Sequence, residues 1–290
     1  PDVFSDVPAE IIGLANKVNS QGMKKVNKYT MNSELSWVVA AAPTEEWARK
    51  VFPGISCEEA VSELWDRILT ASRVDRDDPE RAWHDHNESL RSKTEYLNSM
   101  QFASLHYRSA GNGITKGTDL NIKLPENHIW SGGAEKNAQG IFFNANMPTE
   151  EVFTAPQKDG IDGYVSSSLP FNCNGNLVEN FVLYFESGKV VDMTAEKGLE
   201  TLRELLATDE GASYIGEVAL VPHDSPISNT NTIFFNTLFD ENASCHLAFG
   251  EAYPSCIKGG ELMTEEELEK NGLNTSLIHN DFMIGFPDMD

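Results

Sequence analysis

The chain has 290 residues and carries 45 acidic against 22 basic side chains, which gives a formal net charge of −23. A surface of this charge repels phosphate, so nucleic acid and anionic membranes are poor candidates as partners. Hydrophobic residues make up 40% of the chain, which suffices for a folded core, but the longest apolar run, Trp37–Ala42, is far shorter than the roughly 20 residues of a membrane helix.

Cysteine usage and the two ends of the chain bear on its location. Four cysteines without a Cys-x-x-Cys pair, and no signal-peptide pattern at the start, indicate a reducing, cytoplasmic location. The chain begins at Pro1 without a methionine and stops at Asp290 inside an acidic stretch. We therefore expect a fragment of a longer protein.

The first part of the chain is expected to be the remnant of an α/β layer. The continuous apolar run Ser36–Ala42 is typical of a strand covered on both faces. A helix is predicted after Pro43, and a second one from Cys57. The charge-dense segment 73–78 is the predicted boundary between an α/β remnant, residues 1–75, and a metal-binding catalytic domain, residues 76–290. The apolar stripe of the second helix consists of Val61, Leu64, Trp65, Ile68 and Leu69.

The catalytic part is predicted to be α+β with a mixed sheet. Asp78 and Pro79 suit the N-cap and first turn of a helix that runs to about Met100. After Gln101, short β-type runs alternate with turns, including a predicted hairpin turn at Ser187-Gly188. A helix carrying Leu199, Leu202, Leu205 and Leu206, and another opened by the capping box Thr264–Glu267, interrupt them. The predicted strands are 119–124, 140–144, 181–185, 189–192 and 215–221.

Two pairs of possible metal ligands are spaced by two residues. His84 and His86 lie in the helix predicted after Pro79, where positions i and i+2 point about 200° apart, so a solvated helix face is favoured over a metal site. His279 and Asp281 precede an apolar run and are expected on a strand, where i and i+2 share a face and can reach one ion. Taken alone, that pair is more often an ordinary polar strand end.

Further acids and one base lie in or beside apolar runs. Glu217 is a carboxylate inside an apolar strand, which is costly to bury without a cation, although an edge residue facing water is the simpler alternative. His246 also lies in an apolar run, where a core histidine bound to a carbonyl is common. Taken jointly, two imidazoles and three carboxylates suit a pair of Zn²⁺, Co²⁺ or Mn²⁺ ions that share a bridging carboxylate and a water. The joint set is Glu151, Glu217, His246, His279 and Asp281.

At these positions the sequence resembles the aminopeptidase T / aminopeptidase S family of dinuclear metalloaminopeptidases. The resemblance covers most of the chain after Ser36, with several long motifs in the family's order. These motifs are NMPTEEVFTAP (146–156), YIGEVALVP (214–222), ENASCHLAFGEAYP (241–254), HNDFMIG (279–285), SGKVVDMTAEKG (187–198) and GTDLNIKLP (117–125).

The resemblance implies a cytoplasmic, generally dimeric enzyme that removes N-terminal amino acids from peptides. It implies an N-terminal α/β domain followed by a metal-bearing α+β domain. It also implies a site for two metal ions, which accepts zinc, cobalt or magnesium. Its metal ligands correspond to the five residues above, and a tyrosine near the metals corresponds to Tyr253. Family members extend upstream of Pro1, so the homodimer is expected of the full-length enzyme.

The expected chemistry is hydrolysis by water activated between two metals. By analogy with unrelated dinuclear aminopeptidases, Glu150 is the candidate general base beside the ligand Glu151, and Tyr253 is a candidate donor to the oxyanion. Two alternatives stay open. One is a catalytically silent, acidic structural or oligomerisation fragment, and the other is a different metal hydrolase such as an amidase or carboxypeptidase.

Overall fold

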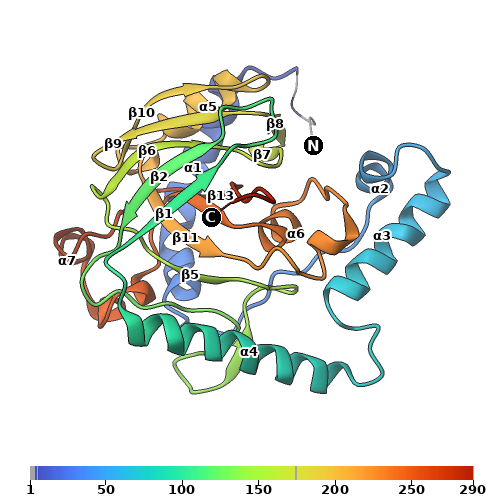
Figure 1. Cartoon of the computed structure of the whole chain (residues 1–290), viewed down its shortest axis with the longest axis horizontal. Helices are drawn as coiled ribbons and strands as arrows, with labels where there is room; N and C mark the ends of the chain where they lie inside the picture. Colours follow the sequence, from blue (N-terminus) through green and yellow to red (C-terminus); the bar gives the residue numbers. More distant parts are fainter. Residues whose placement is uncertain (1–3, 5, 174, 290) are drawn as a thin grey trace.

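Two antiparallel sheets form the centre of the computed structural model, which describes residue 4 and residues 6–173 and 175–289 (Figure 1). The larger sheet has the strand order β1 (Ser104–Ser109), β2 (Thr118–Lys123), β6 (Ile161–Ser166), β9 (Val182–Glu186) and β10 (Lys189–Thr194). The smaller sheet has the order β13 (His279–Met283), β12 (His246–Gly250), β11 (Ile215–Leu220) and β5 (Val152–Thr154). Two hairpins complete the strands: β3 (Ala134–Lys136) with β4 (Phe142–Asn144), and β7 (Phe171–Cys173) with β8 (Asn176–Val178).

The α+β class predicted from the sequence is confirmed, but the named strands pair antiparallel rather than in a mixed sheet. Antiparallel strands need only short connections, and the chain supplies one at Ser187-Gly188 between β9 and β10. Both residues have positive φ, 49° and 82°, as a tight hairpin turn requires. The predicted hairpin is therefore confirmed.

A single apolar core joins the two sheets. Leu120 and Ile122 of β2 and Leu183 of β9 belong to the same buried cluster as Val218 of β11 and Leu247 of β12. Side chains alternate between the faces of a strand, so burying one face leaves the other face of the smaller sheet for polar residues. The polar side chains described below lie on that second face.

The predicted helix ends are confirmed where a cap marks them. Helix α4 (Pro79–Met100) begins after Asp78, whose side chain accepts from the Arg81 N–H, and α7 (Glu265–Lys270) begins with the complete Thr264 capping box. Helix α5 (Leu199–Leu206) buries its leucines in the core. Helix α1 (Ala9–Met31) was not predicted. No helix among the described residues combines the length and the apolarity needed to cross a bilayer.

Helices α2 (Glu45–Val51) and α3 (Cys57–Ala71) pack against each other to one side of the sheets (Figure 1). Of the predicted stripe on α3, Leu64 and Ile68 are buried, whereas Trp65 is 41% exposed. The buried face contacts Phe234 and Phe239, which lie far along the chain, at the start and end of the segment that contains α6 (Thr237–Asp240). The division of the chain at residue 75 stays a prediction.

The predicted strand at 36–42 is wrong. The segment is extended but makes a single isolated bridge, between Val39 and Asn146, and Val38 and Val39 are 58% and 45% exposed. An apolar run forms a buried strand only where neighbouring strands pair with it and other elements cover it. Among the described residues, none of the sheets includes this segment as a strand.

Candidate metal centre

The smaller sheet brings the five predicted ligands to one face. Its register places Glu217 of β11 opposite Ala248 of β12, and Ala248 opposite Asp281 of β13. His246 lies two residues before Ala248, and His279 lies two residues before Asp281. Both histidines therefore point to the same face of the sheet as Glu217 and Asp281. Glu151 lies just before β5, two residues from Phe153, so the two side chains point to the same face. Phe153 pairs with Ala219, which lies on the ligand face. Residues from four separate segments therefore converge.

Small residues leave room between the ligands. Ala219, Ala248 and Gly250 lie on the ligand face and carry at most a methyl group. Gly216 sits at a register shift between Ile215 and Glu217, where a Cβ atom would come 2.3 Å from a backbone carbonyl oxygen of Glu251. Only glycine fits there, and the irregularity sets the direction of the Glu217 side chain.

The five side chains form two groups that share Glu217. In the first group, His246 Nε2 lies 2.8 Å from Glu151 Oε2 and 3.5 Å from Glu217 Oε1. Despite the 2.8 Å separation, Glu151 Oε2 accepts no hydrogen bond from the residues that the structure describes. Close donor atoms that are not aligned for hydrogen bonding are what two ligands of one cation would show.

The second group uses the other oxygen of Glu217. His279 Nε2 lies 3.5 Å from Glu217 Oε2 and 3.6 Å from Asp281 Oδ1. A carboxylate whose two oxygens face two separate imidazole-carboxylate groups has the arrangement expected of a bridging ligand.

Both imidazoles have the orientation that a metal ligand would need. His246 Nδ1 lies 3.0 Å from the carbonyl oxygen of Ser244, and His279 Nδ1 lies 2.7 Å from that of Glu251. A carbonyl oxygen only accepts, so each Nδ1 carries the proton and each Nε2 is left to face the carboxylates. Backbone carbonyls commonly fix the tautomer of metal-binding histidines in this way.

The electrostatics of the five residues favour bound cations. Burial raises the pKa of both Glu151 and Asp281, and the charge of Glu217 adds to the effect. Burial opposes the ionisation of Glu217, but its contacts with His246 and His279 lower its pKa to about 2. Burial likewise disfavours the charged form of His279, yet Asp281 and Glu217 raise its pKa to about 10. Without metal, protons would supply the positive charge that these carboxylates need, so the donor set fits two borderline or hard divalent cations.

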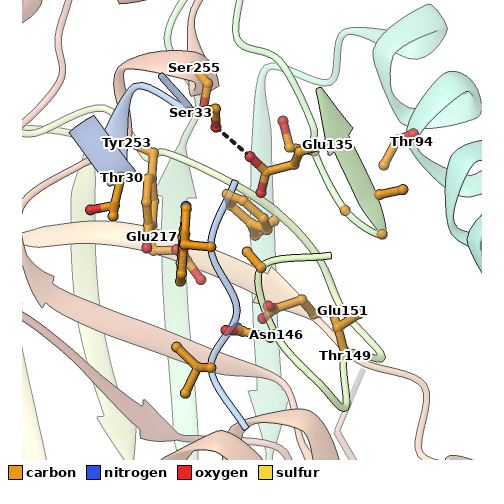
Figure 2. Close-up of a pocket in the computed structure, with 18 of the residues that line it drawn as sticks. Thr30, Ser33, Thr94, Glu135, Asn146, Thr149, Glu151, Glu217, Tyr253 and Ser255 are labelled. Carbon is orange, nitrogen blue, oxygen red and sulfur yellow. Dashed lines mark hydrogen bonds between the residues drawn. The ribbon is translucent and has the colours of Figure 1, made fainter. Parts of the chain in front are cut away.

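All five predicted ligands line one cavity of about 930 Å³, together with Tyr253. Figure 2 shows Glu151, Glu217 and Tyr253 projecting into it, and Glu135 on another part of the wall, where it accepts a 2.6 Å hydrogen bond from Ser33. The Tyr253 ring packs edge-on against His279 with ring centroids 5.0 Å apart. Burial and the neighbouring carboxylates raise the pKa of Tyr253 well above its ordinary value, so its hydroxyl keeps a proton to donate.

The predicted base, Glu150, is not brought together with the other six residues. Its carboxylate does not line the cavity and forms a buried ion pair with Arg73, at 2.6 Å between Oε1 and Nη1. His86 completes this cluster, with Nδ1 3.1 Å from Arg73 Nη2 and Nε2 2.6 Å from the Thr149 carbonyl oxygen. Two neighbouring acids in an extended segment point to opposite sides, so Glu151 turns to the cavity and Glu150 turns away from it.

The solvated helix face predicted for His84 and His86 is right for His84, which is exposed, and wrong for His86, whose side chain is 11% exposed. Because the two residues point apart on α4, one meets water while the other meets the loop that carries Glu150. Burial lowers the pKa of His86. The charge of Glu150 acts in the opposite direction, while the charge of Arg73 adds to the lowering, and the imidazole is kept neutral.

Sequence reasoning also missed Glu241 and Asn242. Glu241 lines the same cavity as the five ligands and is buried, and Asn242 is completely buried beside it. Burial, followed by the charges of Asp281 and Glu151, raises the pKa of Glu241 well above its ordinary value. An available signal was the acidic pair Asp240-Glu241 directly after the apolar pair Leu238-Phe239, because an acid beside an apolar run is the kind of pattern that singled out Glu217.

Comparisons with known proteins agree with this geometry. Residues 1–290 match the family described as thermophilic metalloprotease (M29). The chain is 50% identical over 290 residues to aminopeptidase AmpS of Bacillus subtilis and 47% identical to aminopeptidase 2 of Geobacillus stearothermophilus, covering all of this chain and 69% of each relative. The solved structure of wild-type AmpT from Thermus thermophilus superposes with a TM-score of 0.87 at 44% identity, again over all of this chain and 69% of the other.

Proposed function

Because the chain belongs to the thermophilic metalloprotease (M29) family and is thus a metal-dependent peptidase, we propose that it is an aminopeptidase that uses two divalent cations. The observation that carries the proposal is the pair of ligand groups that share Glu217. The names of the relatives, which are aminopeptidases, support a substrate with a free N-terminus.

Five residues would hold the cations. Glu151, His246 and one oxygen of Glu217 would hold the first, while His279, Asp281 and the other oxygen of Glu217 would hold the second. The imidazole and carboxylate donors suit Zn²⁺, Co²⁺, Mn²⁺ or Mg²⁺. When bound, the cations supply an activated water and polarise the scissile carbonyl group.

The other residues position the substrate and the ligands. The protonated hydroxyl of Tyr253 donates to the oxygen of the scissile carbonyl as negative charge develops there. Glu150, paired with Arg73, holds the segment that carries Glu151 and so acts as a positioning residue rather than as the base facing the substrate. A cytoplasmic location and a dimeric full-length enzyme remain predictions from the family resemblance.

Metal content and peptide hydrolysis, measured together, test the proposal. The chain should bind about two divalent ions and cleave leucine anilide, but it should not cleave N-acetyl-leucine anilide, because an aminopeptidase needs the free amine. Glu217→Ala removes the shared ligand and should lose both metal and activity. Glu186→Ala, at the exposed end of β9, is the matched control and should keep both.

Other outcomes would favour the alternatives. Equal cleavage of the free and the acetylated anilide would indicate a different metal hydrolase. A folded chain that binds no metal and cleaves neither substrate would indicate a catalytically silent structural piece.

A further inference from the structure

Another cavity, of about 300 Å³, is enclosed by α1, α5 and the β7–β8 hairpin (Figure 1). Of the predicted metal ligands, only His279 lines this α1–α5 cavity, and it also lines the metal cavity. Pockets that bind small molecules measure about 300–1,000 Å³, whereas a water molecule takes up about 30 Å³. The α1–α5 cavity therefore has room for a small organic molecule.

Helix α1 turns its polar side toward this cavity. Asn16, Ser20 and Asn27 line it, and their spacing of four and seven residues places them on one side of the helix. The apolar residues Ile11 and Leu14 of the same helix are exposed. A helix that only covered an apolar core would have the opposite orientation, with its apolar side inward. The polar side of α1 is thus suited to a polar occupant.

Two amide groups of the cavity wall have an atom without a hydrogen-bond partner among the described residues. Asn176 of β8 is only 9% exposed, and its Oδ1 is buried and accepts no hydrogen bond. Asn16 Nδ2 is also buried and donates none. Unpaired buried polar atoms are costly, so each calls for a partner that the chain itself does not supply. A fitting ligand has one N–H or O–H donor and one acceptor.

Glu204 of α5 adds a negative charge to the wall. Its side chain is half-buried and packs against Gly13 of α1, where a Cβ atom would lie 3.5 Å from Glu204 Oε2. Its neighbour Arg203 pairs with Glu200 instead, and no other lysine or arginine of the described residues pairs with Glu204. The carboxylate is therefore free to bind a cationic group of a ligand.

A positive charge and an apolar surface lie on the same wall. Lys17 Nζ donates to the carbonyl oxygen of Thr208, which lines the cavity. Ile12, Leu205 and Leu277 supply apolar surface beside these polar groups. The wall thus offers a carboxylate, a nearby ammonium group, unpaired amide atoms and an apolar part.

We propose that the α1–α5 cavity binds a free amino acid with an apolar side chain. Its ammonium group pairs with Glu204 and donates to Asn176 Oδ1. Its carboxylate accepts from Asn16 Nδ2, on the helix that also carries Lys17, and its side chain contacts the apolar part of the wall. A free amino acid is also the product of the proposed aminopeptidase reaction, but the binding site is inferred from the wall and does not depend on that reaction.

Calorimetry on the metal-loaded chain tests the proposal without turnover. The metal cavity is first saturated with 4-methylpentanohydroxamate, which has no ammonium group to pair with Glu204. L-leucine and 4-methylpentanoate, its des-amino counterpart, are then titrated separately. Wild type should bind about one further leucine, and it should bind 4-methylpentanoate about 10–100-fold more weakly, because the charged hydrogen bonds of the ammonium group are lost.

Two variants separate the groups of the ligand. Glu204→Gln should bind leucine about 10–100-fold more weakly without weakening 4-methylpentanoate. Asn16→Ala should weaken both ligands, because both carry the carboxylate. Glu200→Gln is the matched control and should behave as wild type, since it removes an exposed carboxylate one turn away on the same helix, outside the cavity.

Several results would overturn the assignment. A wild-type chain that binds no leucine beside the hydroxamate would show that the cavity holds only water. A Glu204→Gln protein with the wild-type affinity for leucine would place the amino acid elsewhere. If Asn16→Ala does not fold, Asn16→Asp keeps the size of the side chain but opposes the ligand's carboxylate with a negative charge, and unchanged affinities would again refute the proposal.

This inference and the proposed function can fail separately. A chain that binds leucine through Glu204 but cleaves no leucine anilide refutes only the aminopeptidase function. A chain that cleaves the anilide but binds no leucine in a Glu204-dependent way refutes only the α1–α5 site.

Discussion

Replacing Arg73 with methionine should destabilise the protein much more than a surface substitution would. Arg73 lies at the corner between α3 and α4. Its backbone φ is 59°, which residues other than glycine rarely adopt. Its guanidinium group contacts both oxygens of Glu150, at 2.6 and 3.0 Å, and the side chains of the pair are only 11% and 7% exposed. The pair ties the corner to the segment that carries Glu151.

The expected magnitude follows from this burial. Removing one partner of a buried ion pair leaves the other charge uncompensated, which costs about 3–5 kcal/mol. The Arg73→Met/Glu150→Gln double variant leaves no unpaired charge, so it should recover part of that loss. We expect the two substitutions to be non-additive by about 1–3 kcal/mol.

Urea unfolding of the single and double variants measures these free energies. Arg81→Met is the matched control, because Arg81 pairs with Asp85 on α4 while the two side chains are 70% and 56% exposed, and its loss should cost less than about 1 kcal/mol. In the Arg73→Met protein, metal affinity should also fall about 10–100-fold, since the support of Glu151 is lost. An Arg73→Met effect as small as that of Arg81→Met, or strict additivity with Glu150→Gln, would refute the reasoning.

Two further predictions concern a buried acid and the cavity tyrosine. Burial raises the pKa of Asp240 to about 7, so the folded protein holds a proton that the unfolded chain releases above about pH 4. The unfolding free energy of wild type, relative to Asp240→Asn, should therefore fall by about 1.4 kcal/mol per pH unit between about pH 4 and 7, and a pH-independent difference in urea titrations would contradict this. Tyr253→Phe should lower kcat for leucine anilide about 10²–10³-fold at unchanged metal content, and an unaltered kcat would show that the hydroxyl does not meet the oxyanion.

Local sequence signals were sufficient to predict helix ends and turns that are set by a few adjacent residues. The caps at Asp78 and Thr264 and the turn at Ser187-Gly188 act over a few residues, and the structure has each where it was predicted. Helix α1 lacked such a signal, since Ile11 and Leu14 are 57% and 64% exposed and do not mark a buried face.

The predicted ligand residues were named from the sequence, but their convergence depends on the sheet. Two-residue spacing on a strand already places His279 and Asp281 on one face. The position of Glu217 between them and His246 is set by the register of β11, β12 and β13 and by the irregularity at Gly216. Register depends on contacts between segments far apart in the chain, which no local pattern specifies.

The tertiary structure alone decided where the side chains of Glu150 and Glu241 lie. By sequence, Glu150 and Glu151 are equivalent neighbours. In the fold, Arg73 at the α3–α4 corner forms an ion pair with Glu150, while Glu151 lines the cavity. Glu241 reaches the same cavity through the fold around Asn242. The sequence by itself thus determined which side chains can hold cations, because that is a property of the residue types. Which carboxylates have a protein cation and which face the cavity was decided by long-range packing.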